Sequence, residues 1–467
     1  MALSFLDVIV IVLYFAFLLY FGYLTRRTKT FEEFAVGKHS VPAMMVFASM
    51  AATIIGPGFS VGFTAKGWAT GYLFYYLVLA YAVQVVVAGL FLAPRLSRQR
   101  DCSSLGDVMR KKYGVIAQLL TGIVSVGLCI GFAAVMGKVG GSILHAITGW
   151  PLGISLVIVT GVTALVTFSG GVRATIATEG LQFSLKSIAV SILLLLAIVK
   201  TPDSLSSIAE RAHELTQQGL QGMNGWQIFG IVLSFMVGEA LIPPYANRAL
   251  GAKTEIASKQ GFVAAGLFCV VWLAMVALLG VVAHGLLPAD TSGDDVFVTI
   301  AQKVLPTGLF GLLLAAVIAI VMASQESVLN SSAVAFVRDI VGVVHSPSER
   351  TTLLLAKIST LVFAALAVYA AQFAPSIIDG LLVLYSIWAP TILLPLVLGL
   401  YIERTKPAAG CLSILAGGGS SIVWQTFLHE PYGIPAILIG LSASAAGYFV
   451  GQMAGLRLAA QKQGALS

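Results

Sequence analysis

Long hydrophobic runs dominate this chain, and short polar stretches separate them from one end to the other. Each run approaches or exceeds the roughly 20 residues that an α-helix needs to cross the hydrocarbon core of a bilayer. The pattern predicts an all-α polytopic membrane protein with many spans, because a soluble domain would bury its apolar residues in one core. Thirteen spans are predicted, at 4–25, 41–66, 70–95, 115–147, 151–170, 174–200, 224–248, 258–286, 306–343, 352–374, 376–400, 407–428 and 433–455.

Composition and charge agree with this interpretation. The chain is 58% hydrophobic and 10% charged, whereas soluble domains carry about 25% charged residues. Asp7 lies inside the first run and no basic segment precedes it, which predicts a retained helix and not a signal peptide. Most lysines and arginines, Arg248 among them, fall in segments that are cytoplasmic if the N-terminus lies outside. We therefore expect a protein of the cytoplasmic (inner) membrane, with its N-terminus outside and its C-terminus in the cytoplasm.

Several function classes are excluded at this stage. The sequence shows no basic patch interleaved with aromatic residues, so nucleic acid is not an expected partner. Residues 58–62 match the GxSxG pattern of hydrolases, but that pattern needs a strand, a turn and a nearby histidine, and here it lies inside a predicted span. We expect no enzyme, no cofactor and no metal other than a transported ion. The lipid bilayer is the expected environment, and the sequence leaves open whether the protein is a monomer or an oligomer.

Two predicted spans are interrupted by glycine and proline. One break is Ile54-Ile55-Gly56-Pro57-Gly58, and the other covers 238–244, where Gly238 and Glu239 precede two prolines. Proline and glycine end helical hydrogen bonding, and backbone exposed at membrane depth is tolerated only around a protected cavity. Each break opens a block of five spans, and the two blocks enter the membrane from opposite sides. This is typical of inverted-repeat transporters, whose binding site lies between the broken helices.

The predicted organisation follows from these blocks. Residues 1–40 form an extra N-terminal helix and a cytoplasmic loop, 41–200 the first repeat, 224–400 the second repeat, and 401–467 two C-terminal helices and a short tail. A channel would not need paired broken helices. A transport sensor would need a signalling domain, and the tail after the last predicted span holds about 12 residues.

Charged and polar residues inside the predicted spans mark a candidate site. A charge at the bilayer centre costs roughly 2.5–3.5 kcal/mol, so these groups are expected to face a cavity or one another. Ser324, Ser327 and Ser331 share one helix face. A packing ion pair, such as Lys186 with Glu326, is the structural alternative. The charged residues in question are Lys138, Glu179, Lys186, Glu239 and Glu326.

Four sets of residues stand out as motifs: 51–58 with Gly62, Gly170-Gly171 with Thr178-Glu179-Gly180-Leu181-Gln182, 248–254, and Ser324 to Ser332 followed by Phe336 and Arg338-Asp339-Ile340. In their order and residues these motifs resemble the sodium:solute symporter family. The resemblance covers roughly 35–455. It implies a LeuT-like fold of ten core helices in two inverted repeats, and sodium-coupled symport of a small solute by alternating access.

The resemblance also assigns ion ligands. Sodium is expected at the carbonyls of Ala52 and Ile55 with Ile320, Ala323 and Ser324, although Ala323 lacks the hydroxyl usual at its position. Hard cations prefer such oxygen ligands. A second ion position maps to Glu179, Glu326 and Ser327.

The coupling ion stays open between sodium and a proton. If Glu179 and Glu326 approach one another, mutual repulsion and burial would allow one of them to take a proton. Lys186 follows Glu179 by seven residues on the same helix face, so it would instead neutralise Glu326 and replace a cation permanently. The sequence does not decide among these possibilities.

The solute is expected near mid-membrane between the two breaks, but its identity is not predicted. A hexose is not expected, because Phe59, Val78 and Tyr81 stand where the family's sugar carriers have other groups. A zwitterion, an organic cation and a carboxylate all remain open. The candidate solute-binding residues are Gly56, Pro57, Gly58, Phe59, Lys138 and Glu239.

Overall fold

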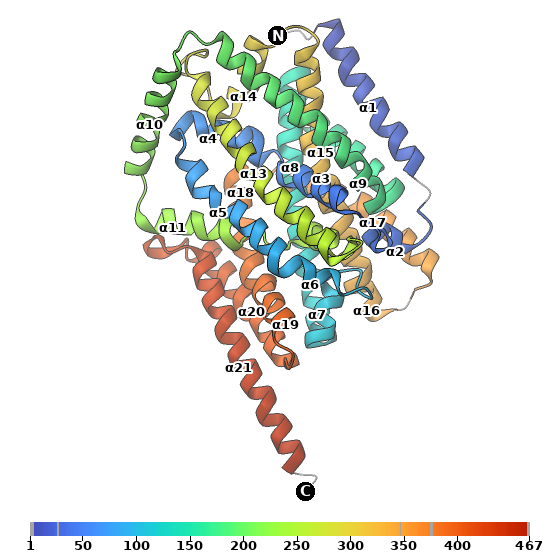
Figure 1. The fold of residues 1–467 in the computed structure, drawn as a ribbon. Coiled ribbons are helices and arrows are strands. Elements are labelled where there is room, and N and C mark those ends of the chain that lie inside the picture. Colours follow the sequence, from blue (N-terminus) through green and yellow to red (C-terminus); the bar gives the residue numbers. More distant parts are fainter. Residues whose placement is uncertain (1–3, 26–27, 346, 374–376, 465–467) are drawn as a thin grey trace.

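The computed structural model describes residues 4–25, 28–345, 347–373 and 377–464. Helices follow one another along the chain (Figure 1), and the described residues contain no strand apart from an isolated bridge between Val41 and Ala252. The all-α prediction is confirmed. Helix α1 (Phe5–Thr25) begins at one end of the bundle, and α21 (Ala436–Gly464) ends at the other (Figure 1).

The first block contains the first predicted break. Helix α3 (Ala43–Ile54) stops there, and the π-helix η2 (Gly58–Gly62) and α4 (Phe63–Thr70) continue after a bend of 63°. Helix α9 (Leu152–Lys200) is interrupted at Gly171, where φ is 58°. A Cβ at Gly171 would lie 2.4 Å from the Phe34 ring, so both the backbone conformation and the packing require glycine. The remaining members of the block are α5 (Leu73–Val87), η3 (Ala88–Leu92), α6 (Ala93–Ser97) and α8 (Val115–Thr148).

The second block contains the second predicted break. Helix α11 (Gly225–Val237) ends at Gly238, and α12 (Pro243–Gly251) starts on two prolines, which suit the first turn of a helix. Leu241, between the two helices, has a φ of 51°. The rest of the block is α13 (Glu255–Ala283), α15 (Leu309–Ala335), η5 (Phe336–Val341), α16 (Gly342–Val344), α17 (Glu349–Ala370), α18 (Ile377–Trp388), η6 (Ala389–Leu393) and α19 (Leu394–Tyr401). The C-terminal helices are α20 (Pro407–Ile422), η7 (Val423–Phe427), η8 (Pro431–Gly433) and α21.

The number of membrane spans is supported in part. By length and composition, ten helices among the described residues are suited to cross a membrane, and the bent pair of α3 with η2 and α4 is an eleventh. Two shorter apolar helices, Phe5–Leu18 and Gly225–Val237, occupy the places of the predicted first and seventh spans. The count of thirteen therefore stays a prediction.

The sequence analysis left several short helices outside the spans unpredicted. The longest, α10, is amphipathic: it buries Ile208 and Ala212, and it packs against Gly71 after α4. Because long apolar runs predict the spans, and α10 has a polar face and only 17 residues, its segment is predicted as a connection between spans. The helices are α2 (Phe31–Val36), η1 (Gly37–His39), α7 (Leu105–Tyr113), α10 (Leu205–Gln221), η4 (Gly293–Asp295) and α14 (Val296–Val304).

Helix α15 is the centre of the bundle. Within the span Leu309–Val344, 94% of the most apolar window is buried, whereas the other full-length spans are 33–61% buried. It packs mainly on α8 and α9 and also contacts α3 and α12. Its polar stripe therefore faces protein and not lipid.

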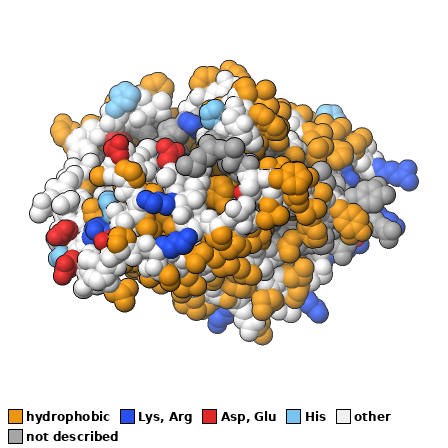
Figure 2. Space-filling view, turned by 90° about the horizontal axis from the view of Figure 1, so that it is seen from above, with side chains coloured by type: hydrophobic (Ala, Val, Ile, Leu, Met, Phe, Trp, Pro, Cys, Tyr) orange, Lys and Arg blue, Asp and Glu red, His pale blue; other side chains and the backbone are white. Residues whose placement is uncertain are grey.

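The outside of the bundle is apolar along its flanks. Leu195, Val199 and Leu267 expose 60% or more of their surface from helices that qualify as spans, as expected for side chains in contact with lipid. Figure 2 views the end at which α1 begins, where acidic and basic side chains are scattered among hydrophobic ones, with more hydrophobic side chains toward the rim. The arrangement is that of an integral membrane protein.

Candidate functional site

A buried tryptophan binds a backbone carbonyl at the second break and another next to the first break. Trp272 of α13 donates from Nε1 to the carbonyl of Phe59 at 2.9 Å, and Trp388 of α18 donates in the same way to Ala240 at 2.9 Å. A carbonyl left without a donor at membrane depth would cost several kcal/mol. The breaks are thus supported by their neighbours.

Glu239 lies in the second break, surrounded by tyrosines. Its Oε1 accepts a hydrogen bond from the Tyr245 hydroxyl at 2.5 Å, and its Oε2 accepts one from the Tyr385 hydroxyl. The hydroxyl of Tyr81 lies 2.9 Å from that of Tyr245. Among the described residues, no lysine, arginine or histidine forms an ion pair with Glu239. This buried carboxyl group therefore has hydroxyl partners and no cationic one.

The first break reaches the same place through Phe59. The ring of Phe59 lies 4.6 Å from that of Tyr81 and 5.9 Å from that of Phe235, and Phe235 lies 5.8 Å from Tyr385. The two breaks therefore meet in one group, which we call the aromatic–carboxylate cluster. It consists of Phe59, Tyr81, Phe235, Glu239, Tyr245 and Tyr385.

The C-terminal end of α3 is bound by two side chains from other helices. Lys186 of α9 donates from Nζ to the carbonyls of Ala52, at 2.6 Å, and Ile55, at 3.4 Å. Ser324 of α15 donates to the carbonyl of Thr53 at 3.1 Å and lies 3.4 Å from its own helix carbonyl at Ile320. All these residues are buried. The structure thus places a lysine ammonium on the two α3 carbonyls at which the resemblance expects sodium.

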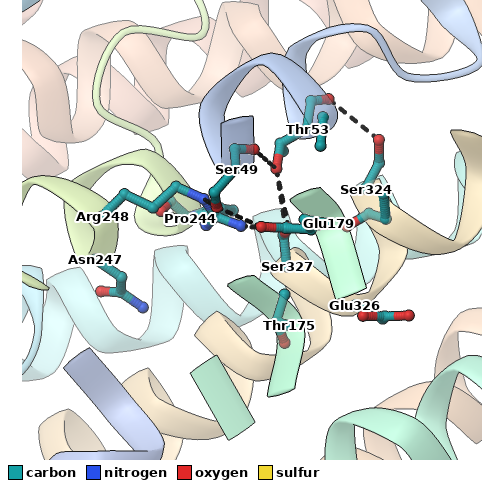
Figure 3. Close-up of polar contacts among 12 residues, drawn as sticks. Ser49, Thr53, Thr175, Glu179, Pro244, Asn247, Arg248, Ser324, Glu326 and Ser327 are labelled. Carbon is teal, nitrogen blue, oxygen red and sulfur yellow. Dashed lines mark hydrogen bonds and ion pairs between the residues drawn. The ribbon is translucent and has the colours of Figure 1, made fainter. Parts of the chain in front are cut away.

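Next to this point, Glu179 of α9 pairs with Arg248 of α12. Arg248 Nη2 lies 2.6 Å from Glu179 Oε1 and 2.5 Å from Ser327 Oγ, and its Nε donates to Ser49 Oγ at 2.6 Å. Ser49 and Ser327 both donate to the same carboxylate. Figure 3 shows these side chains converging from separate helices, with Thr53 at the edge of the group.

This pairing corrects one expectation. The sequence analysis assigned Arg248 to a cytoplasmic segment by its position after a span, yet only 1% of its side chain is exposed. Arg248 lies on α12, which packs inside the bundle after the break. Its positive charge therefore compensates the buried carboxylate of Glu179.

Glu326 of α15 is buried beside α9. Its Oε2 accepts from the hydroxyl of Thr178 at 2.9 Å, and its Oε1 is buried without a hydrogen-bond partner among the residues that the structure describes. The alternative that the sequence left open, an ion pair of Lys186 with Glu326, is not present, since Lys186 binds the carbonyls of Ala52 and Ile55. Figure 3 places Glu326 apart from the Arg248 group.

The serine stripe of α15 does face the broken helices. Ser324 contacts Thr53 in α3, Ser327 contacts Glu179 and Arg248, and Ser331 accepts from Asn247 of α12 at 3.1 Å. The Ala323 carbonyl lies 3.0 Å from Ser327 Oγ. The stripe is therefore placed as its spacing predicted, while the ion-binding roles assigned to it stay predictions.

The candidate solute residues are brought together in part. Phe59 and Glu239 belong to the aromatic–carboxylate cluster, and Gly56 lies against Ser324, where a Cβ would be 2.8 Å from the hydroxyl oxygen. Pro57 and Gly58 are buried in the first break. Lys138 lies half-buried on α8, whose neighbouring Gly137 faces Gln325.

Tyr245, Tyr385 and Ser49 were not anticipated as site residues. Spacing gave a signal only for Tyr245, six residues after Glu239 on the far side of the break. Tyr385 comes from a span 146 residues away from Glu239, and Ser49 from one 130 residues away from Glu179. Nothing local in the sequence indicates these two contacts.

A second polar cluster lies toward the end of the bundle where α7 and α16 are found (Figure 1). Asp339 accepts from Ser104 Oγ at 2.6 Å and Gln118 Nε2 at 3.2 Å, and Asp107 accepts from Arg338 Nε at 2.9 and 3.0 Å. The cluster joins α7 and α8 to the end of the α15 span. It ties this end of the two repeats together.

Two broken helices whose breaks meet inside an all-α membrane bundle are typical of a secondary transporter with a LeuT-like fold. The sequence matches the model of the sodium:solute symporter family over residues 34–418, and the chain belongs to that family. Its relatives include the sodium/pantothenate symporters of Haemophilus influenzae, 25% identical over 92% of this chain and 93% of that protein, and of Escherichia coli, 25% identical over 92% of each. The Danio rerio sodium/glucose cotransporter 4 is 22% identical over 78% of this chain and 62% of its own length.

Solved structures support the fold. A substrate-bound, outward-open Na+-coupled sialic acid symporter superposes with a TM-score of 0.83, at 18% identity over 97% of each chain. A nucleobase-cation-symport-1 family transporter in a closed conformation superposes with a TM-score of 0.62, at 13% identity over 92% of this chain and 95% of that one. At these identities the comparison establishes the architecture, and the chemistry of the site rests on this chain's own residues.

Proposed function

We propose that this protein is a sodium-coupled symporter that carries a small polar or charged organic solute by alternating access. The observation that carries the proposal is the meeting of the two helix breaks at the aromatic–carboxylate cluster, inside a chain of the sodium:solute symporter family. A solute bound between the two repeats is exposed to one side or the other as they rock. The repeats are proposed to span 41–200 and 224–400, flanked by 1–40 and 401–467.

The solute is proposed to bind along Gly56, Pro57, Gly58 and Phe59 on one side and Glu239 on the other, with Lys138 nearby. Glu239 has hydroxyl donors and no ion-pair partner in the described residues, which favours a solute with an ammonium group. Aromatic faces close to the carboxylate add attraction for a cation. The relatives named for pantothenate and glucose show that the family accepts diverse solutes, so the charge of this solute is open to test.

A second candidate is proton-coupled symport in the same fold. It is favoured by Glu326, whose Oε1 is buried without a partner, and by the basic side chains at both candidate ion positions. The predicted sodium roles of Ala52, Ile55, Ile320, Ala323 and Ser324, and the predicted ion role of Glu179, Glu326 and Ser327, remain to be tested. Imposed gradients separate the two candidates.

The test begins with a thermal-shift screen of small metabolites on the purified protein, with and without sodium. The stabilising solute is then used for uptake into proteoliposomes under an imposed sodium gradient or an imposed pH gradient. Accumulation with sodium alone supports sodium coupling. Accumulation with the pH gradient alone, lost in Glu326→Gln, supports the proton candidate. Equal flux without either gradient, and no accumulation, contradicts symport altogether.

We further propose that the protein resides in a cytoplasmic (inner) membrane, with its N-terminus outside and its C-terminus in the cytoplasm. The distribution of lysine and arginine supports this orientation. Labelling of single cysteines, placed in α10 and at the end of α21, by a membrane-impermeant thiol reagent tests it. We expect labelling of α10 in intact cells and labelling of α21 only after lysis.

A further inference from the structure

We infer that Lys186 is the resident cation of the site at the end of α3, so that its ammonium takes the position at which this family's fold would otherwise bind sodium. The starting point is direct contact: Nζ lies 2.6 Å from the Ala52 carbonyl and 3.4 Å from the Ile55 carbonyl. These are the two α3 oxygens that the family resemblance assigns to the ion. The inference concerns the ion site of the proposed symporter and rests on that proposed function.

The local chemistry of α3 explains why a cation belongs here. The helix stops at Ile54, so its last carbonyls lose their helical partners, and the helix dipole places partial negative charge at the same end. The Thr53 carbonyl accepts from Ser324, and the Ile55 carbonyl also lies 3.3 Å from Ser60 Oγ. The Ala52 carbonyl is the one bound most closely by Lys186.

The side chain of Lys186 has the properties of a built-in ion. An ammonium has three donors and no acceptor, and the contacts of Nζ are to carbonyl oxygens, the ligand type that sodium uses. Lys186 is fully buried, and none of the ion pairs in the described part of the chain includes it. A buried unit charge of this kind needs compensation, and the α3 carbonyls are the compensation that the structure provides.

The neighbouring candidate ion position shows the same replacement. Glu179 and Ser327, which the resemblance assigns to a second ion, are bridged by the guanidinium of Arg248 at 2.6 and 2.5 Å. Both positions therefore hold a basic side chain of this protein. A sodium ion that drives transport then uses oxygen ligands other than the Ala52 and Ile55 carbonyls.

The simplest alternative is that Lys186 only caps a helix end. The two readings differ when the ammonium is removed, because a cation position vacated by Lys186→Met should accept sodium at Ala52, Ile55 and Ser324. A helix cap that is lost should leave no sodium preference behind. The experiment therefore measures sodium binding and not uptake.

The purified full-length protein is melted in NaCl and in KCl at equal ionic strength. We expect the melting temperatures in NaCl and KCl to differ by the same amount in wild type and in Ser324→Ala, because the site already holds Lys186 in both proteins. In Lys186→Met the melting temperature should rise with NaCl and not with KCl, and the rise should disappear in Lys186→Met/Ser324→Ala. Lys357→Met, which removes a half-buried lysine of α17 that lies over Phe168, is the matched control and should respond as wild type does.

Two outcomes overturn the inference. One is a rise of the wild-type melting temperature in NaCl over KCl that Ser324→Ala reduces by tenfold or more. That result would place sodium beside Lys186. The other is a folded Lys186→Met variant with no added sodium response, which would reduce Lys186 to a helix cap. If Lys186→Met does not fold, Lys186→Gln, which also removes the ammonium, takes its place in the same comparison of NaCl with KCl. A failure of symport would appear in the wild-type uptake assay and would leave this binding result unaffected.

Discussion

The guanidinium of Arg248 lies 2.6 Å from the carboxylate of Glu179, and the contact joins the second repeat to the first. The side chains are 1% and 0% exposed. Two charges removed from water are tolerated only when their geometry and additional hydrogen bonds are good, and here Ser49 and Ser327 provide those bonds. Movement between the repeats has to carry this group along or break it.

Removing the acid of this pair should destabilise the protein strongly. Glu179→Gln leaves Arg248 charged and buried, and breaking a buried pair in this way costs about 3–5 kcal/mol. The melting temperature in detergent measures the loss. The matched control is Glu255→Gln, which breaks the exposed pair with Arg98 and should leave the melting temperature nearly unchanged. Equal losses in the two variants would contradict the structural role of the buried pair.

The tyrosines around Glu239 should affect the apparent affinity for the solute. Tyr385→Phe removes one hydrogen bond to a carboxyl group, worth about 1.5–3 kcal/mol, and should raise the KM for uptake by roughly tenfold or more. Glu239→Gln should have a larger effect on a solute that carries an ammonium group. Tyr432→Phe, at a residue 90% exposed outside the cluster, is the control and should leave KM unchanged. An unchanged KM in both cluster variants would place the solute elsewhere.

Close packing of α4 on α13 should make its glycines irreplaceable. A Cβ at Gly280 would lie 2.3 Å from the Thr64 carbonyl, and one at Gly67 would lie 2.3 Å from the Ala277 carbonyl. Because backbone cannot retreat as a flexible side chain can, Gly280→Ala should destabilise by about 1–3 kcal/mol. Gly127→Ala in α8, where no atom lies within 4 Å of the added carbon, should be neutral or slightly stabilising. Thermal melting of the two variants provides the comparison.

Acid should weaken the contact between α2 and its following turn. The hydrogen-bonded ion pair with Lys38, at 2.8 Å, and a hydrogen bond from the Lys29 N–H lower the pKa of Glu33 to about 2 from its usual 4.5. A carboxyl group whose pKa is lower in the folded state stabilises that state above the unfolded pKa, and the stabilisation is lost as pH falls toward the folded pKa. The melting difference between wild type and Glu33→Gln should therefore be constant above about pH 5 and shrink between pH 4.5 and 2.

The control for that titration is Glu32→Gln, at the neighbouring exposed position, where 51% of the side chain is accessible. Its melting difference from wild type should stay small throughout the same pH range. If the difference in melting temperature between wild type and Glu33→Gln grew on acidification, it would contradict a lowered pKa of Glu33 in the folded state.

The architecture could be predicted from the sequence because the bilayer imposes it. Hydrophobic length determines which segments span, and Gly56-Pro57-Gly58 and Pro243-Pro244 determine where two spans break, since proline cannot continue a helix. The serines at 324, 327 and 331 share a face by helical periodicity alone. All of these are local properties. The structure confirms the two breaks and the shared serine face, and ten or eleven of the described helices are long and apolar enough to cross a membrane.

The partner of each buried charge was decided only by the tertiary structure. Lys186 could have reached Glu326 by spacing, and Arg248 could have pointed to the cytoplasm. Packing of α9 and α12 against α3 brings Lys186 to the Ala52 carbonyl and Arg248 to Glu179. Periodicity specifies the face of a helix but not the atom that meets it, because that atom comes from a segment 131 to 134 residues away for Lys186 and 69 away for Arg248. The helices were therefore determined by the sequence read locally, and the charge pairing by how those helices pack.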